Sequence, residues 1–169
     1  MNINKFSAPP FIVPFSIFIF STTALAIAYF VEYFLEIEPC LLCLYQRIPY
    51  FASGVLGLVA LITSYRRVRV VEAAGVIFGF NATIAFYHLG VEQHWWMSVI
   101  ACGAHGGDVG AKTVEELQQL LLTGDPVKAC DNINWSLFGF SMATYNVIVS
   151  LILSVGSFFG AYKIGAYSE

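Results

Sequence analysis

Four long apolar runs constrain the fold of this chain more than any other feature. The first run has no charged residue between Phe6 and Val31, and about 20 apolar residues in a helix cross a bilayer. Hydrophobic residues make up 58% of the 169 residues and charged residues only 11%, too few to cover a soluble globule. The sequence therefore predicts a single all-α membrane domain, a four-helix transmembrane bundle with spans at about 11–35, 48–65, 73–91 and 141–162.

The start of the first run also resembles a cleaved signal peptide. Lys5 precedes the run, and Ala24-Leu25-Ala26 has the small residues of a cleavage site. The apolar character continues past Ile27 without the polar stretch in which such a site usually lies. A membrane span is therefore the preferred interpretation.

Basic and acidic residues separate toward opposite ends of the predicted bundle. The dense basic stretch Arg66–Arg69 follows the second run, and cytoplasmic loops carry the excess of Lys and Arg. Acidic residues gather in 36–47 and 92–140, the two outer loops. We therefore expect both termini to be cytoplasmic. An oxidising compartment then faces all the cysteines, which are Cys40, Cys43, Cys102 and Cys130.

The second outer loop contains a short helical pattern. Thr113 and Glu116 match a capping box, and apolar residues then recur on one helical face until Gly124. About ten residues cannot span a bilayer, so we expect a short amphipathic helix on the membrane surface or against the bundle. Several glycines follow Cys102, which predicts an easily rearranged backbone around that cysteine.

Cys40 and Cys43 form a Cys-x-x-Cys pair, whose sulfurs lie close enough for one small disulfide ring. If the second apolar helix begins just after Pro39, the positive end of its dipole favours the thiolate. Arg47 adds a fixed positive charge one turn beyond Cys43. The pair is therefore predicted to be redox-active.

Each of these residues also has a plainer interpretation. The cysteine pairs could be structural disulfides, and Arg47 could simply extend to the lipid headgroups. Asn81 and His88, in the third run, are more often hydrogen-bond partners between helices than ligand contacts. Cys102 and Cys130 lack the close spacing of a second zinc knuckle, so no metal site is expected.

The pattern Pro-Cys-x-x-Cys-x-Tyr-x-Arg from Pro39 to Arg47, with four spans and an outer cysteine pair, resembles the DsbB family of quinone-linked disulfide-forming membrane proteins. The segments Tyr87–Glu92 and Trp135–Gly139 also resemble parts of that family. The resemblance covers nearly the whole chain.

This resemblance implies a quinone-dependent protein-disulfide oxidoreductase of the bacterial inner membrane, with its cysteine loops in the periplasm. A DsbA-like thioredoxin-fold protein would give two electrons to Cys102–Cys130, which would pass them through Cys40–Cys43 to ubiquinone or menaquinone. A DsbA-like oxidant, at roughly −120 mV, needs a stronger electron acceptor than glutathione. Cys43 and Arg47 would contact the quinone, and His88 is a further candidate contact. The mobile backbone predicted at Cys102 makes it the expected point of attack.

Two other functions stay open. One is a quinone-linked reductase of the vitamin K epoxide reductase type, and the other is a non-enzymatic four-span protein with structural disulfides. The net charge of −3, with only 8 Lys and Arg residues, gives no support to nucleic-acid binding. The expected partners are therefore a thiol protein, membrane lipid and quinone.

Overall fold

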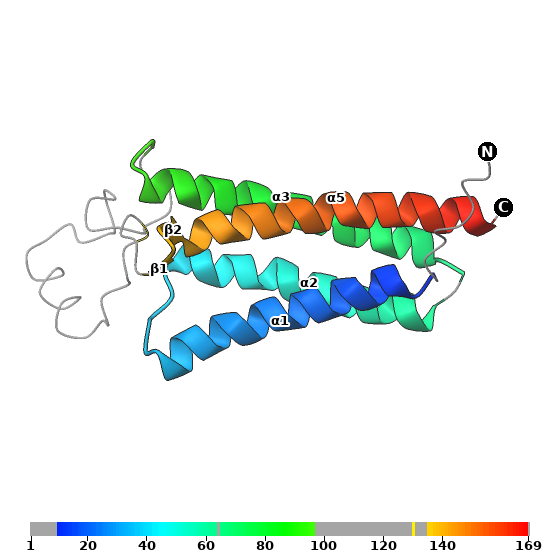
Figure 1. Cartoon of the computed structure of the whole chain (residues 1–169), viewed down its shortest axis with the longest axis horizontal. Coiled ribbons are helices and arrows are strands. Elements are labelled where there is room, and N and C mark those ends of the chain that lie inside the picture. Colours follow the sequence, from blue (N-terminus) through cyan, green and yellow to red (C-terminus); the bar gives the residue numbers. More distant parts are fainter. Residues whose placement is uncertain (1–9, 64, 97–129, 131–134, 169) are drawn as a thin grey trace, which may run out of the picture.

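The computed structural model describes residues 10–63, 65–96, 130 and 135–168. Its helices lie side by side along the long axis of the molecule (Figure 1). They are α1 (Ile12–Phe34), α2 (Leu41–Ile62), α3 (Arg67–Glu92) and α5 (Met142–Ser168). The predicted all-helical class is confirmed, apart from one short hairpin. The amphipathic helix expected near 113–124 lies outside the described residues, as does Cys102.

Three of the helices are long and apolar enough to cross a membrane, namely α1, α3 and α5. Helix α2 has 22 residues but carries Gln46 and Arg47 in its second turn, which shortens its apolar part. Many large apolar side chains on the sides of the bundle are exposed, such as Phe51, Phe80 and Ile152. A bundle that exposes such a surface along its length matches a lipid environment.

Small residues let neighbouring helices approach closely. Ser154 Oγ of α5 donates a hydrogen bond to the carbonyl of Gly75 in α3 at 2.8 Å. Between α1 and α2, a Cβ atom at Gly57 would lie 2.9 Å from the backbone nitrogen of Phe18. Such contacts hold membrane helices together where apolar burial supplies no driving force.

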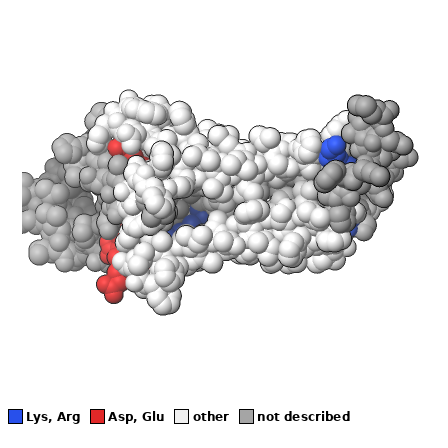
Figure 2. All heavy atoms as spheres, in the orientation of Figure 1, with Lys and Arg blue, Asp and Glu red and all other residues white. Residues whose placement is uncertain are grey.

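The helices form an open rather than a closed arrangement. Helix α2 packs against α1 and α3, and α3 packs against α5, whereas α1 has few contacts with α5. Most basic residues of the described chain lie at the end where α3 begins and α5 ends, together with Glu72, and the other acidic residues lie toward the opposite end, together with Arg47 (Figure 2). The beginning of α2 is at the acidic end (Figure 1).

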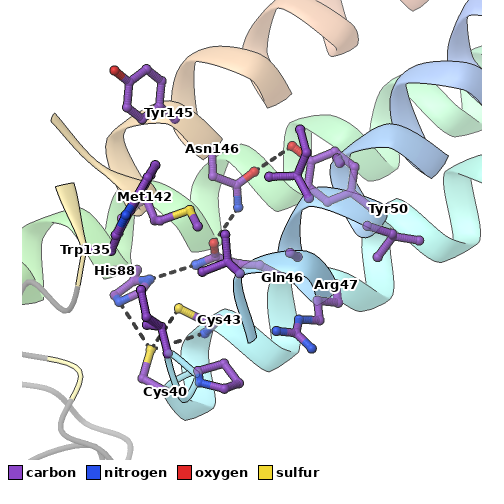
Figure 3. A pocket seen from close by; sticks show the side chains of 18 of the residues that line it. Cys40, Cys43, Gln46, Arg47, Tyr50, His88, Trp135, Met142, Tyr145 and Asn146 are labelled. Atoms are coloured by element: carbon purple, nitrogen blue, oxygen red, sulfur yellow. Dashed lines mark hydrogen bonds between the residues drawn. The ribbon is translucent and has the colours of Figure 1, made fainter. Parts of the chain in front are cut away.

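A two-stranded antiparallel hairpin leads into α5. Strand β1 (Ser136–Leu137) pairs with β2 (Phe140–Ser141), with Ser136 opposite Ser141. Phe138 and Gly139 form the turn with φ values of 50° and 82°, as a two-residue type I′ turn requires. The hairpin leads into the start of α5, and Trp135 lies just before it at a cavity that His88 and Met142 also line (Figure 3).

Candidate functional site

The thiol pair lies at the N-terminus of α2. Cys40 is the N-cap, with φ −71° and ψ 167°, and its Sγ accepts a hydrogen bond from the backbone N–H of Cys43 at 3.4 Å. The sulfur therefore takes the place of the side-chain oxygen that usually caps a helix. The two Sγ atoms lie 3.1 Å apart, with Cys40 as the donor, and both cysteines are free thiols.

A third cysteine reaches the pair from a distant part of the chain. Cys130 is 1% exposed and packs with Cys40, Leu42 and Val91 in one buried cluster. Its thiol is hydrogen-bonded to that of Cys40. The structure thus brings together three of the four cysteines singled out in the sequence, and the fourth, Cys102, is outside the described residues.

Cys40 and Cys43 lie ahead of the predicted second span, and their pKa values move in opposite directions. The hydrogen bond from Cys40 lowers the pKa of Cys43. For Cys40, the hydrogen bond from Cys130 lowers the pKa, but the hydrogen bond to Cys43 and burial outweigh it and raise the pKa to about 12. Of the two sulfurs, Cys43 is therefore the one that more readily carries negative charge.

His88 of α3 lies directly beside the thiols. Its Nε2 is 3.5 Å from Cys40 Sγ and 3.6 Å from Glu92 Oε1. On the other side of the ring, Nδ1 is 3.1 Å from Gln46 Nε2, and the Gln46 side chain in turn contacts Asn146 of α5 (Figure 3). Asn81, seven residues before His88 in α3, donates a hydrogen bond to Ser150 Oγ of α5 at 2.9 Å. Both polar residues of the third run therefore make hydrogen bonds between helices.

Arg47 is held on the side of α1. Its Nη1 is 2.5 Å from Glu32 Oε2, and its guanidinium lies over the ring of Tyr29 at 4.8 Å from the centroid. The Arg47 and Glu32 side chains are 15% and 24% exposed. Arg47 therefore has a defined protein partner, which the sequence analysis did not anticipate.

A cavity of about 230 Å³ connects these groups. Apolar side chains of α1 and α5 form much of its wall, and several polar residues of α2 and α3 line it near the thiols. These polar residues include Cys43, Gln46, Arg47, His88 and Glu92. The cavity is bounded by the two helices that hardly contact each other, α1 and α5.

The donor atoms of Cys40, Cys43 and His88 all lie within 4.8 Å of one another. Within this group, Cys40 Sγ contacts both Cys43 Sγ at 3.1 Å and His88 Nε2 at 3.5 Å. The arrangement suits hydrogen-bonded thiols that exchange with a neighbouring cysteine.

Residues 12–160 match the family model described as "Disulfide bond formation protein DsbB". The chain belongs to the DsbB family. No solved structure gave a significant match.

Several curated relatives carry the name "Disulfide bond formation protein B". One from Xylella fastidiosa strain 9a5c is 29% identical over 143 residues, which cover 82% of each chain. One from Acinetobacter baylyi is 28% identical over 145 residues, covering 80% of this chain and 81% of the relative. One from Methylobacillus flagellatus is 30% identical over 134 residues, covering 78% and 80%. This DsbB-family chain is therefore a membrane protein of disulfide bond formation.

The site contains residues that the sequence analysis did not single out. Gln46, Asn146 and Glu32 were absent from the candidate set, although they contact His88 or Arg47 or are one contact away. Each is a polar residue within or at the edge of an apolar run, and such residues usually mark functional or inter-helix contacts in membrane proteins. That signal was available in the sequence.

Proposed function

We propose that this DsbB-family protein reoxidises a periplasmic DsbA-like thiol protein and passes the electrons to a membrane quinone. Family membership supports an oxidoreductase of disulfide formation. The observation that carries the finer proposal is the packing of Cys130 against Cys40, beside Cys43 and an apolar cavity. A relay through mixed disulfides needs this proximity between its two cysteine pairs.

The first exchange takes place at the outer cysteine pair. A thiolate of the partner attacks Cys102, the Cys102–Cys130 bond breaks, and Cys130 leaves as a thiolate. The second thiol of the partner then closes the partner's own disulfide and releases Cys102. Two electrons have thus moved from the partner to the outer pair.

The second exchange takes place at the beginning of α2. Cys130 attacks Cys40 of the Cys40–Cys43 disulfide, and Cys43 leaves as the thiolate. Cys102 then displaces Cys40 from the mixed disulfide and restores Cys102–Cys130. The lowered pKa of Cys43 supports its role as the leaving sulfur, because a thiol with a lower pKa leaves faster.

The cavity fits a quinone head group. Its volume of about 230 Å³ suits one ring but not a long isoprenoid tail, which would extend into lipid. A bound quinone supplies a sink for two electrons and two protons, and so allows Cys40–Cys43 to return to the disulfide. Arg47 places a guanidinium at the cavity, where it would hold negative charge, and His88 adds a hydrogen-bonding group at the same end.

We further propose that α2 crosses the bilayer with the other helices. Both termini and the basic α2–α3 turn would then be cytoplasmic, and the thiol end would be periplasmic in the inner membrane. The separation of charge between the two ends of the bundle supports this orientation (Figure 2).

The proposal is tested by turnover of purified protein with a reduced DsbA-like protein and either ubiquinone-1 or a menaquinone analogue. We expect catalytic oxidation of the thiol protein, with one quinone consumed for each disulfide formed. A reductase of the vitamin K epoxide type would reduce quinone with a small dithiol but gain no rate from the thiol protein. A protein whose disulfides are only structural would consume no quinone.

A further inference from the structure

A directed series of hydrogen bonds connects α5 to the thiols. Asn146 Nδ2 donates to Gln46 Oε1, which leaves the amide nitrogen of Gln46 directed at His88 Nδ1 at 3.1 Å (Figure 3). An amide nitrogen is a donor only, so Nδ1 must be the accepting nitrogen of a neutral imidazole. The ring proton of His88 is therefore on Nε2.

The orientation of Asn146 is itself determined by its neighbours. Its Oδ1 accepts hydrogen bonds from Tyr50 OH at 2.6 Å and from Asn81 Nδ2 at 3.3 Å. With Asn81 Nδ2 as donor, the oxygen of Asn146 faces Asn81 and Tyr50, and the amide nitrogen faces Gln46. These groups are buried among α2, α3 and α5, where reversing one amide would leave several polar groups unpaired.

The opposite side of the His88 ring requires the same tautomer. Nε2 lies near two acceptors, Cys40 Sγ at 3.5 Å and Glu92 Oε1 at 3.6 Å. A proton on Nε2 can hydrogen-bond to Cys40 Sγ and is attracted to the Glu92 carboxylate, whereas an unprotonated Nε2 would face that carboxylate with its lone pair. Cys40 then donates its own thiol proton to Cys43 Sγ at 3.1 Å.

We propose that Gln46 and Asn146 are positioning residues that hold His88 in its Nε2–H tautomer, and so place the negative charge of the thiol pair on Cys43. The donors run in one direction, from Asn146 through Gln46, His88 and Cys40 to Cys43. Hydrogen bonds aligned in this way polarise one another. The inference deepens the proposed function, since it rests on the role assigned there to Cys43 as the leaving sulfur.

Other titratable groups surround the same cavity and contribute to the charge on Cys43. The charges of Glu92 and Cys130 oppose the Cys43 thiolate. The other titratable groups that line the cavity or pack against the thiols are Glu38, Arg47, Tyr50, Tyr87 and Tyr145. None of them is altered in the variants below, so their contribution is common to all.

The first test measures the reactivity of Cys43 in the full-length reduced protein, with no quinone or partner present. Iodoacetamide alkylation of each cysteine is followed against pH in the presence of EDTA, with tandem mass spectrometry to separate Cys40 from Cys43. We expect Gln46→Leu to raise the midpoint for Cys43 by about one pH unit, equivalent to about tenfold in thiolate population near neutral pH. Asn146→Leu should raise it less. Gln93→Leu, the same substitution at an exposed position, should leave it unchanged.

The second test observes the tautomer directly and needs no folded variant of the network. Nitrogen-15 NMR of histidine-labelled protein distinguishes a protonated ring nitrogen from an unprotonated one, and His88 is assigned by comparison with His88→Gln. We expect a protonated Nε2 and an unprotonated Nδ1 for His88. A protonated Nδ1 in the wild type, or an unchanged Cys43 midpoint in both leucine variants, would overturn the inference. If the His88 tautomer and the Cys43 midpoints are as expected but the protein does not turn over quinone, the proposed function alone is overturned.

Discussion

The two polar groups beside the thiols are held in different ways. His88 is joined through neutral hydrogen bonds to α2 and α5, and it is 2% exposed. Arg47 is held by one carboxylate and one aromatic ring of α1, and both members of the ion pair are partly exposed. A buried network of hydrogen bonds resists rearrangement, whereas a partly exposed ion pair contributes less to stability.

Because they are held differently, we expect His88 and Arg47 to have different roles in the proposed reaction. In the proposed mechanism, the His88 side holds one arrangement of protons while the thiol pair is reduced. The Arg47 side would release its guanidinium from Glu32 when another negative charge arrives in the cavity. The helix contacts agree, because α1 carries the partner of Arg47 and packs mainly against α2, while α2, α3 and α5 form the His88 side.

The largest effect is expected at Cys43, on which both the His88 side and the Arg47 side act. Cys43→Ser removes the sulfur that both sides serve, so quinone-dependent oxidation of a thiol protein should fall by on the order of a thousandfold or more. The helical circular dichroism should stay unchanged, because serine is close to cysteine in size. Turnover within tenfold of wild type would show that neither side acts through Cys43.

Arg47→Ala tests the exchangeable side alone. Loss of a charge-assisted hydrogen bond, worth about 1.5–3 kcal/mol, should raise the apparent KM for quinone by about tenfold or more. Arg47→Lys should restore only part of this, since lysine lacks the planar fork of donors. Unchanged quinone kinetics in the alanine variant would return Arg47 to a contact with lipid headgroups.

Gly57→Ala disturbs the packing of α1, the helix that carries Glu32, and so tests the Arg47 side separately from the His88 side. The added Cβ would lie 2.9 Å from the backbone of Phe18, so α1 must shift on α2, at a cost of about 1–3 kcal/mol in stability. We expect a lower thermal midpoint and a raised KM for quinone, but an unchanged pH profile for alkylation of Cys43. Gly156→Ala is the matched control, because a Cβ there meets nothing within 4 Å. A shift in the pH profile of Cys43 alkylation as large as the change in KM for quinone would contradict separate roles for the Arg47 and His88 sides.

Glu32→Gln should have the smallest effect, and in the opposite direction to the loss of Arg47. Removing the competing carboxylate leaves the guanidinium free, so the KM for quinone should fall by about two- to fivefold, in keeping with an ion pair worth about 1 kcal/mol or less. Steady-state kinetics at low ionic strength would show this most clearly. A KM raised as far as in Arg47→Ala would mean that Glu32 positions Arg47 instead of competing for it.

The family and the helical class could be predicted because they depend on local patterns. Long apolar runs give helices in a membrane, and the stretch from Pro39 to Arg47 carries its motif in consecutive residues. Pro39 disfavours a helical conformation of Glu38 and so keeps α2 from beginning earlier, and the observed N-cap is Cys40.

The partners of the site residues could not be predicted in the same way. Asn146, Ser150 and Ser154 recur every four residues, which marks one polar face of α5. The period alone does not say which helix that face meets, and the contact of Asn146 with Gln46 depends on the register of α5 against α2. The contact of Cys130 with Cys40 likewise depends on the tertiary fold.

The most direct test of the account uses only the thiol pair of α2. The Cys102→Ser, Cys130→Ser double variant, reduced and freed of reductant under anaerobic conditions, is mixed with ubiquinone-1 in a single turnover. Quinone loss is followed by its ultraviolet absorbance, and free thiols are counted after quenching. The account predicts one quinol and one Cys40–Cys43 disulfide for each protein molecule. Unchanged quinone, with both thiols still reduced in a folded protein, would contradict it.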